Sequence, residues 1–135
     1  LSPFECLCGN FILPEPASYV FFYAFSNLRN LLYIIPASRP VIAAKRDNMD
    51  EYDTIFVGFP IWWYIAPTII NTFLESYNLK GKTVITFATS GGSGMGKTNE
   101  KLTPSCPGAK LLHGKVFNSY SSKADLSAWV ETLSL

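Results

Sequence analysis

The chain has 135 residues, a length that suits one domain with a single hydrophobic core. Apolar residues make up 48% of the sequence and the formal net charge is only +1, so the composition excludes a disordered chain and lacks the basic face that nucleic-acid binding requires. No apolar run is long enough to span a bilayer, and the first residues lack the basic start of a signal peptide, so we expect a soluble, cytoplasmic protein.

The N-terminal third has the weakest pattern. We expect residues 1–17, which contain prolines and no regular periodicity, to be an irregular tail of one domain that covers residues 1–135. Tyr19–Phe25 and Asn30–Ile35 are both rich in β-forming residues, but only residues 26–29 separate them. Because a parallel crossover needs a dozen or more residues, the two segments form a hairpin or one of them is not a strand. After Pro40, Val41–Met49 predicts a helix.

From Thr54 onward, strands alternate with helices. Thr54–Phe59 is a continuous apolar run, which indicates a strand buried on both faces. A helix begins near Pro67 and is stopped in the region of Gly81. Its apolar face comprises Ile69, Ile70, Phe73 and Leu74.

The same alternation continues to the C-terminus. Thr83–Ala88 predicts a second strand, Lys97–Leu102 a short helix, and Lys110–Phe117 a third strand broken at Gly114. Ser122 is a predicted N-cap of the last helix, with an acid three residues later. The inward stripe of that helix comprises Leu126, Trp129, Val130 and Leu133. This order predicts an α/β fold, an open parallel sheet with helices on both faces.

Two unusual loops follow two of these strands directly. Pro60–Ala66 supplies three large rings, and Thr89–Gly96 supplies glycines and hydroxyls. Ligands of open α/β sheets bind beyond the carboxyl ends of the strands, so both loops should lie at one edge of the sheet.

The pairing of these loops suits a flat, conjugated ligand with polar edges. Trp62, Trp63 or Tyr64 can stack on its face. The glycine-rich loop allows close approach of backbone N–H groups, which can donate to ring oxygens and nitrogens. A flavin fits this description, and so does a purine. The competing interpretation is that the tryptophans are core or interface residues and that the glycine loop is a flexible turn.

Other chemistry has weaker signals. Gly92 to Thr98 ends in Gly-Lys-Thr but has one residue too few between its glycines for a phosphate-binding Walker loop. His113 lies in a predicted strand without an acid or thiol at a telling spacing, so we expect a structural role. Cys6, Cys8 and Cys106 are an odd set without dense spacing, which indicates free thiols rather than a disulfide framework or a metal site.

Two long motifs carry a family resemblance. Tyr52–Glu75 and Gly81–Gly94 resemble the bacterial flavodoxin-like proteins, and the resemblance extends over about residues 38–135. It implies a flavodoxin-like sheet of five parallel strands with flavin mononucleotide (FMN) at the carboxyl edge. Carried over by position, the cofactor-binding residues are Pro60, Ile61, Trp62, Trp63, Tyr64 and Ala66 beside the ring system, and Thr89, Ser90, Gly91, Gly92 and Ser93 at its pyrimidine end.

The sequence departs from this family after the first strand. The family has a phosphate loop there, but Phe25–Asn30 contains no glycine or threonine and leaves no room for a helix. The N-terminal strand–helix unit is therefore shortened. Losing three or four hydrogen bonds to a charged group removes roughly 5–10 kcal/mol of binding energy. We expect FMN to bind weakly or not at all unless Ser26, Asn27 or Arg29 substitutes, or unless a second chain completes the site in a homodimer.

Two functions follow from the resemblance. The first is a flavodoxin-like, FMN-dependent protein that transfers electrons to a redox partner protein or reduces a small acceptor of the quinone type. The sequence does not decide between carrier and oxidoreductase. The second is a shortened scaffold that has lost FMN and acts as an oligomeric binding module. A nucleotide hydrolase is a third, weaker hypothesis. We expect no nucleic-acid or membrane partner.

Overall fold

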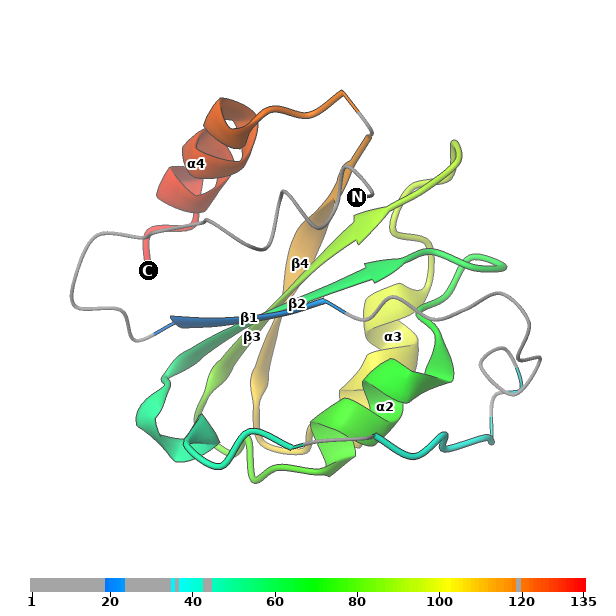
Figure 1. Ribbon diagram of the computed structural model, residues 1–135, viewed down its shortest axis with the longest axis vertical. Coiled ribbons are helices and arrows are strands. Elements are labelled where there is room, and N and C mark those ends of the chain that lie inside the picture. The colour runs from blue at the N-terminus through cyan, green and yellow to red at the C-terminus, as the bar shows by residue number, and fades with distance from the viewer. Residues whose placement is uncertain (1–18, 24–34, 36, 43–44, 119) are drawn as a thin grey trace.

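The computed structural model describes residues 19–23, 35, 37–42, 45–118 and 120–135. Within them lies a four-stranded parallel sheet of order β1-β2-β3-β4 (Figure 1). The strands are β1 (Tyr19–Tyr23), β2 (Thr54–Pro60), β3 (Thr83–Thr89) and β4 (Lys110–Phe117). The predicted open parallel α/β sheet is confirmed. Almost all of the other strand candidate, Asn30–Ile35, lies outside the described residues.

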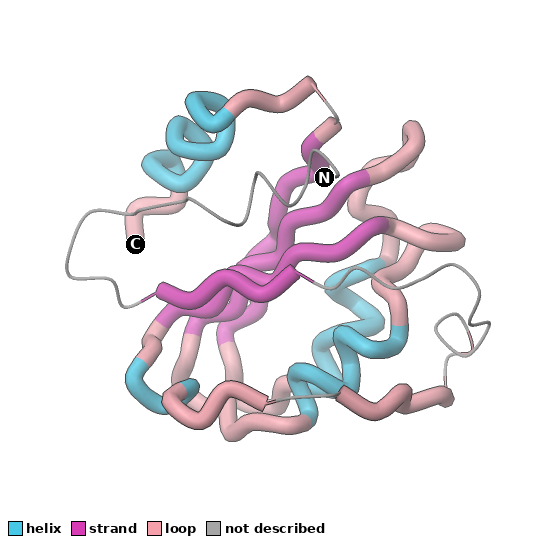
Figure 2. Tube along the Cα trace, in the orientation of Figure 1, coloured by secondary structure: helices cyan, strands magenta, loops and turns pink. Residues whose placement is uncertain are grey.

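Helices cover both faces of the sheet, as the sequence predicts. Helix α2 (Thr68–Glu75) and helix α3 (Thr98–Leu102), which runs into the 3-10 turn η3 (Thr103–Ser105), lie on one face. Helix α4 (Lys123–Thr132) lies on the other (Figures 1 and 2). None of the described helices combines the length and the apolar character needed to cross a membrane.

The apolar run of β2 supplies both cores. Alternate residues of a strand point to opposite faces, so Ile55, Val57 and Phe59 join the cluster under α2 and α3. Phe56 joins the cluster under α4. All four side chains are fully buried. A strand enclosed on both faces cannot alternate apolar and polar residues, which explains its continuous pattern.

Trp129 anchors α4 on the sheet. Its ring packs edge-on against Phe117 and Phe56, with ring centroids 5.3 and 5.9 Å apart, and at a tilt against Phe87 at 6.3 Å. The N-terminus of the helix is closed by a capping box, in which Ser122 and Asp125 satisfy each other's backbone N–H groups. Both predictions for this helix, its N-cap and its inward stripe, are confirmed.

Gly114 lies at an irregularity in the pairing of β3 with β4, where the register shifts between Ile85 and Phe87. A side chain at this position would overlap the backbone carbonyl of Thr86. Strand β4 runs through Gly114, so the predicted break at this residue is wrong. Glycine is required there because the backbones of β3 and β4 approach too closely for a side chain.

The predicted helix Val41–Met49 is wrong in its described residues. Residues 41–42 and 45–48 are not helical, and only the 3-10 turn η2 (Met49–Glu51) follows them. Val41 is 90% exposed, and the N–H of Arg46 donates to the hydroxyl of Tyr77 at 2.8 Å. A short helix is stabilised mainly by packing of its apolar face. Here Val41 does not pack, and the backbone N–H of Arg46 bonds to Tyr77 instead of to a carbonyl within a helix. Helix α2 also ends at Glu75, before Gly81.

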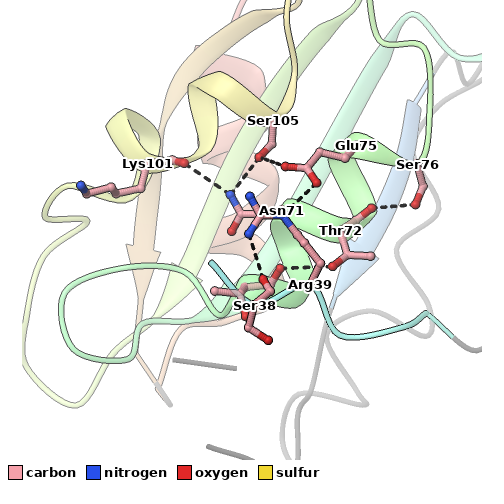
Figure 3. Close-up of polar contacts among 9 residues, drawn as sticks. Ser38, Arg39, Asn71, Thr72, Glu75, Ser76, Lys101 and Ser105 are labelled. Atoms are coloured by element: carbon pink, nitrogen blue, oxygen red, sulfur yellow. Dashed lines mark hydrogen bonds and ion pairs between the residues drawn. The ribbon is translucent and has the colours of Figure 1, made fainter. Parts of the chain in front are cut away.

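A cluster of polar side chains joins the segment before β2 to helix α2 and the turn η3 (Figure 3). The carboxylate of Glu75 accepts hydrogen bonds from Arg39 Nε at 2.8 Å and from the hydroxyl of Ser105 at 2.7 Å. Asn71 donates to the same Ser105 oxygen at 2.9 Å. The hydrogen bond from Arg39 lowers the pKa of Glu75 against the opposing effect of partial burial.

Replacing Trp129 with Ala should destabilise the fold by about 3–5 kcal/mol, because it removes a buried ring against three others. Urea unfolding followed by far-UV circular dichroism measures the change. The exposed Glu131→Ala on the same helix is the control, with an expected effect within about 0.5 kcal/mol. A loss below about 1 kcal/mol for the tryptophan variant would contradict the role of this ring.

Replacing Glu75 with Gln should destabilise the protein by at most about 1 kcal/mol at neutral pH, because the ion pair is partly exposed. A lowered folded-state pKa stabilises fully above the unfolded value of about 4.3, and the contribution is lost as pH falls through the folded pKa. The difference between wild type and variant should therefore be larger at pH 7 than at pH 3. An equal difference at both would show that the pair contributes nothing.

Candidate functional site

The two loops of interest are neighbours at the carboxyl edge of the sheet. β2 and β3 pair in register up to their last residues, Pro60 opposite Thr89. Directly beyond them, the N–H of Ile61 donates to the carbonyl of Thr89 at 2.8 Å. The polypeptide therefore leaves both strands at the same place, and the loops diverge from a shared, hydrogen-bonded origin.

The aromatic loop is a tight two-residue turn. Trp62 and Ile65 exchange backbone hydrogen bonds of 3.0 and 3.1 Å. The two residues between them, Trp63 and Tyr64, have φ angles of 51° and 67°. Such angles at both central positions are typical of a type I′ turn, which strongly prefers Asn and Gly. Large side chains in this region are strained, by about 1–3 kcal/mol each.

The six predicted residues of this loop divide into anchors and exposed rings. Ile61 and Ala66 are buried in the core under α2 and α3, and they hold the base of the turn. Trp63 and Tyr64 are 78% and 68% exposed. Trp62 is half-buried. The sequence reading treated the three rings alike, but only Trp63 and Tyr64 present most of their surface outward.

The glycine-rich loop is organised by Ser90. Its hydroxyl oxygen accepts the N–H groups of Gly92 at 3.2 Å and Ser93 at 2.8 Å, and it pairs with the Ser93 hydroxyl at 2.7 Å. The N–H groups of Gly91 and Gly94 have no hydrogen-bond partner among the described residues. Apart from the chain neighbours, no heavy atom of the described residues lies within 4 Å of where a Cβ would stand on Gly91, Gly92 or Gly94. Within the described part of the chain, the loop therefore keeps open space and two N–H groups without a partner.

The far end of this loop is held by α3. The side chain of Asn99, which is 9% exposed, donates to the carbonyl of Leu112 at 2.9 Å and accepts from the hydroxyl of Thr86 at 2.8 Å. The fully buried Thr98 donates to the carbonyl of Met95. These contacts fix the start of α3 to β3 and β4. Sequence reasoning missed these contacts, because every residue of Thr98–Leu102 except Leu102 is polar and the pattern does not show which of them are buried.

The site offers binding groups but no reactive side chain. The loops Pro60–Ala66 and Thr89–Gly96 contain no acid, no histidine and no cysteine, and their only titratable side chain is that of Tyr64. Cys106 is buried, and burial raises the pKa of its thiol, which makes it a poor nucleophile. The two loops themselves therefore supply binding groups and no nucleophile paired with a base. The segment compared with the phosphate loop, Phe25–Asn30, lies outside the described residues.

The comparisons with known proteins agree with this architecture. The family model for flavodoxins matches residues 32–133. The chain belongs to the flavodoxin family. No curated protein matches this flavodoxin-family chain.

Two solved structures are similar to it. A candidate flavoprotein from Bacteroides eggerthii DSM 20697 is 40% identical, with a TM-score of 0.67, over 76% of this chain and 64% of that one. A second, from Bacteroides uniformis ATCC 8492, is 43% identical, with a TM-score of 0.66, over 73% of this chain and 62% of that one. The flavodoxin-family chain described here thus spans less than two thirds of the length of either protein.

The strain in the aromatic turn can be measured directly. Replacing Trp63 with Asn and Tyr64 with Gly gives the residues that a type I′ turn prefers, and both original rings are largely exposed. The double variant should therefore be more stable than wild type by about 1 kcal/mol or more, measured by urea unfolding. A less stable double variant would mean that the rings pack in the free protein and that the turn is not strained.

Proposed function

We propose that this chain binds FMN non-covalently between the turn Trp62–Ile65 and the loop Ser90–Gly94, and that it functions as a redox flavoprotein. The observation that carries the proposal is the pair of exposed rings, Trp63 and Tyr64, held on a hydrogen-bonded turn beside a loop in which two N–H groups have no partner among the described residues. Family membership and the two similar candidate flavoproteins support a flavin as the ligand.

The residues at this edge fit a flavin. Aromatic side chains stack on the faces of conjugated rings and exclude water from them. The N–H groups of Gly91 and Gly94 can donate to oxygen and nitrogen atoms at a pyrimidine edge, as can those of Gly92 and Ser93 if Ser90 releases them. The loops carry no acid that would repel an anionic ligand.

The protein's part in the chemistry is binding and tuning. A bound flavin supplies the electron transfer. Donors from the glycine loop would stabilise negative charge at the pyrimidine end and so raise the reduction potential. Trp63 and Tyr64 would shield one region of the ring from water while the exposed edge stays accessible to a partner protein or a small acceptor of the quinone type. Transfer to a partner and reduction of a small acceptor both remain part of this proposal.

A second candidate function rests on the same two rings. Exposed aromatic side chains at 78% and 68% also suit a subunit interface. In that case the chain is a shortened flavodoxin scaffold that has lost FMN, and the turn joins two copies of the chain. A homodimer is compatible with the first candidate too, if the second chain supplies phosphate contacts. The cytoplasmic location stays a prediction.

Titrating the purified protein with FMN tests the proposal. Saturable quenching of flavin fluorescence and a shifted visible spectrum are expected for wild type. The double variant W63N/Y64G should bind about 10–100-fold more weakly, because two stacking interactions are lost, although its unfolding free energy is higher. Val41→Ala, at an exposed apolar residue outside the two loops, should bind like wild type.

The same variants separate the two candidates. If wild type shows no flavin binding, and if light scattering shows a dimer that W63N/Y64G dissociates, the rings form an interface and the FMN proposal fails. If wild type binds FMN in a saturable, stoichiometric manner, the lost-cofactor scaffold is excluded.

A further inference from the structure

The aromatic turn and the glycine-rich loop meet at a second point, Gly96. This residue has a φ angle of +55°, and it lies between the loop and helix α3. A Cβ atom built on it would stand 2.7 Å from the backbone oxygen of Tyr64 and 3.5 Å from the Tyr64 Cβ. Real Cβ atoms essentially never approach another atom so closely. The two loops are therefore in backbone contact, and only a residue without a side chain allows it.

Neither side of this contact can yield easily. Tyr64 belongs to the turn that Trp62 and Ile65 close with two hydrogen bonds, and its carbonyl is backbone rather than the flexible end of a side chain. On the other side, Gly96 is two residues before Thr98, which is fully buried. The next residue, Asn99, is hydrogen bonded to β3 and β4. The distance between the loops is therefore set where Gly96 meets Tyr64.

The other glycines of the loop differ from Gly96 in this respect. Among the described residues, Gly91, Gly92 and Gly94 have nothing but their chain neighbours within 4 Å of their Cβ positions. A side chain at any of those three positions would therefore meet no steric clash in the free protein. Gly96 is also absent from the residues that the family resemblance assigns to the cofactor.

We infer that Gly96 is a positioning residue of the FMN site proposed above, on which the inference rests. It touches no ligand itself. By letting the Tyr64 backbone approach, it sets the spacing between the rings of Trp63 and Tyr64 and the N–H donors of the glycine loop. A side chain at position 96 would separate the rings from the donors, so that one flat ligand could no longer contact both optimally.

Two substitutions separate the contact from backbone strain. Gly96→Ala adds a Cβ and also strains the positive φ, whereas Gly96→Asn adds a Cβ on a residue type that tolerates positive φ. The matched controls are Gly108→Ala and Gly108→Asn. Gly108 has a φ of +79°, and its Cβ would meet the flexible Cγ of Lys80 at 3.0 Å and the Lys80 Cβ and Cα at ordinary contact distances of 3.5 and 3.6 Å. It precedes β4, at the opposite edge of the sheet.

FMN titration of these four variants is the test. A displacement of several tenths of an ångström should break a hydrogen bond to the flavin or its contact with an aromatic ring, and the loss of one such contact should weaken FMN binding about tenfold or more. We expect this for Gly96→Asn and Gly96→Ala, together with less quenching of the bound flavin. Gly108→Asn and Gly108→Ala should bind within about twofold of wild type, even where their urea midpoints fall. If wild type binds FMN and Gly96→Asn binds it equally well, the inference is overturned and the proposed function stands. If wild type binds no FMN, the proposed function fails, and the inference about Gly96 fails with it.

A test without flavin covers the case in which the Gly96 variants fold poorly. In the W63N/Y64G background, residue 64 is a glycine and its backbone can move away. Gly96→Asn should then lower the urea midpoint less than it does in wild type, or should fold where the single variant does not. Equal shifts in both backgrounds would show that Gly96 and Tyr64 are not coupled, which overturns the inference.

Discussion

The pairing of β2 with β3 is the interaction on which the rest of this structure depends. Both strands are buried on both faces, and they remain in register from Thr54 opposite Thr83 to Pro60 opposite Thr89. Their hydrophobic contacts fix the strands to two separate cores, and the ladder fixes their ends to each other. Every feature of the candidate site is attached to those ends. A slip of one residue would turn each side chain to the wrong core, so the register is strongly specified.

The site itself is built from conformations that would not be stable alone. Trp63 and Tyr64 occupy backbone angles that suit Asn and Gly, and both rings are exposed to water. The buried neighbours Ile61 and Ala66 hold the turn in place. Strain of this kind persists where the surrounding structure over-determines it, and it is concentrated at functional sites. The turn thus holds two rings in a fixed position at a cost in folding stability. Selection for stability alone would favour Asn and Gly at these two positions.

The two loops of the site contain no acid, no histidine and no cysteine, which limits the chemistry that they can perform. Neither loop has a side chain that can act as a nucleophile with a neighbouring base, so binding is the function that the geometry supports. The glycine loop satisfies part of its own backbone through Ser90, which keeps it ordered in the free protein and leaves the remaining donors for a ligand. The proposed redox role would therefore depend on a cofactor, for which the protein would supply orientation, shielding and hydrogen bonds.

The sequence by itself determined strands β2, β3 and β4, the last helix and the neighbourhood of the two loops, but it left the place of β1 open. These follow from local causes: a continuous apolar run, a capping box at Ser122, and the rule that parallel strands end at one edge. It failed at Val41–Met49, because Val41 stays exposed and the N–H of Arg46 bonds to the distant Tyr77 hydroxyl instead of within a helix. Only the tertiary structure decided which rings are exposed, which N–H groups Ser90 takes, and that Gly96 touches Tyr64. Those features depend on atoms that are distant in the sequence or on backbone angles that side-chain identity does not specify, and so no pattern of residue types records them.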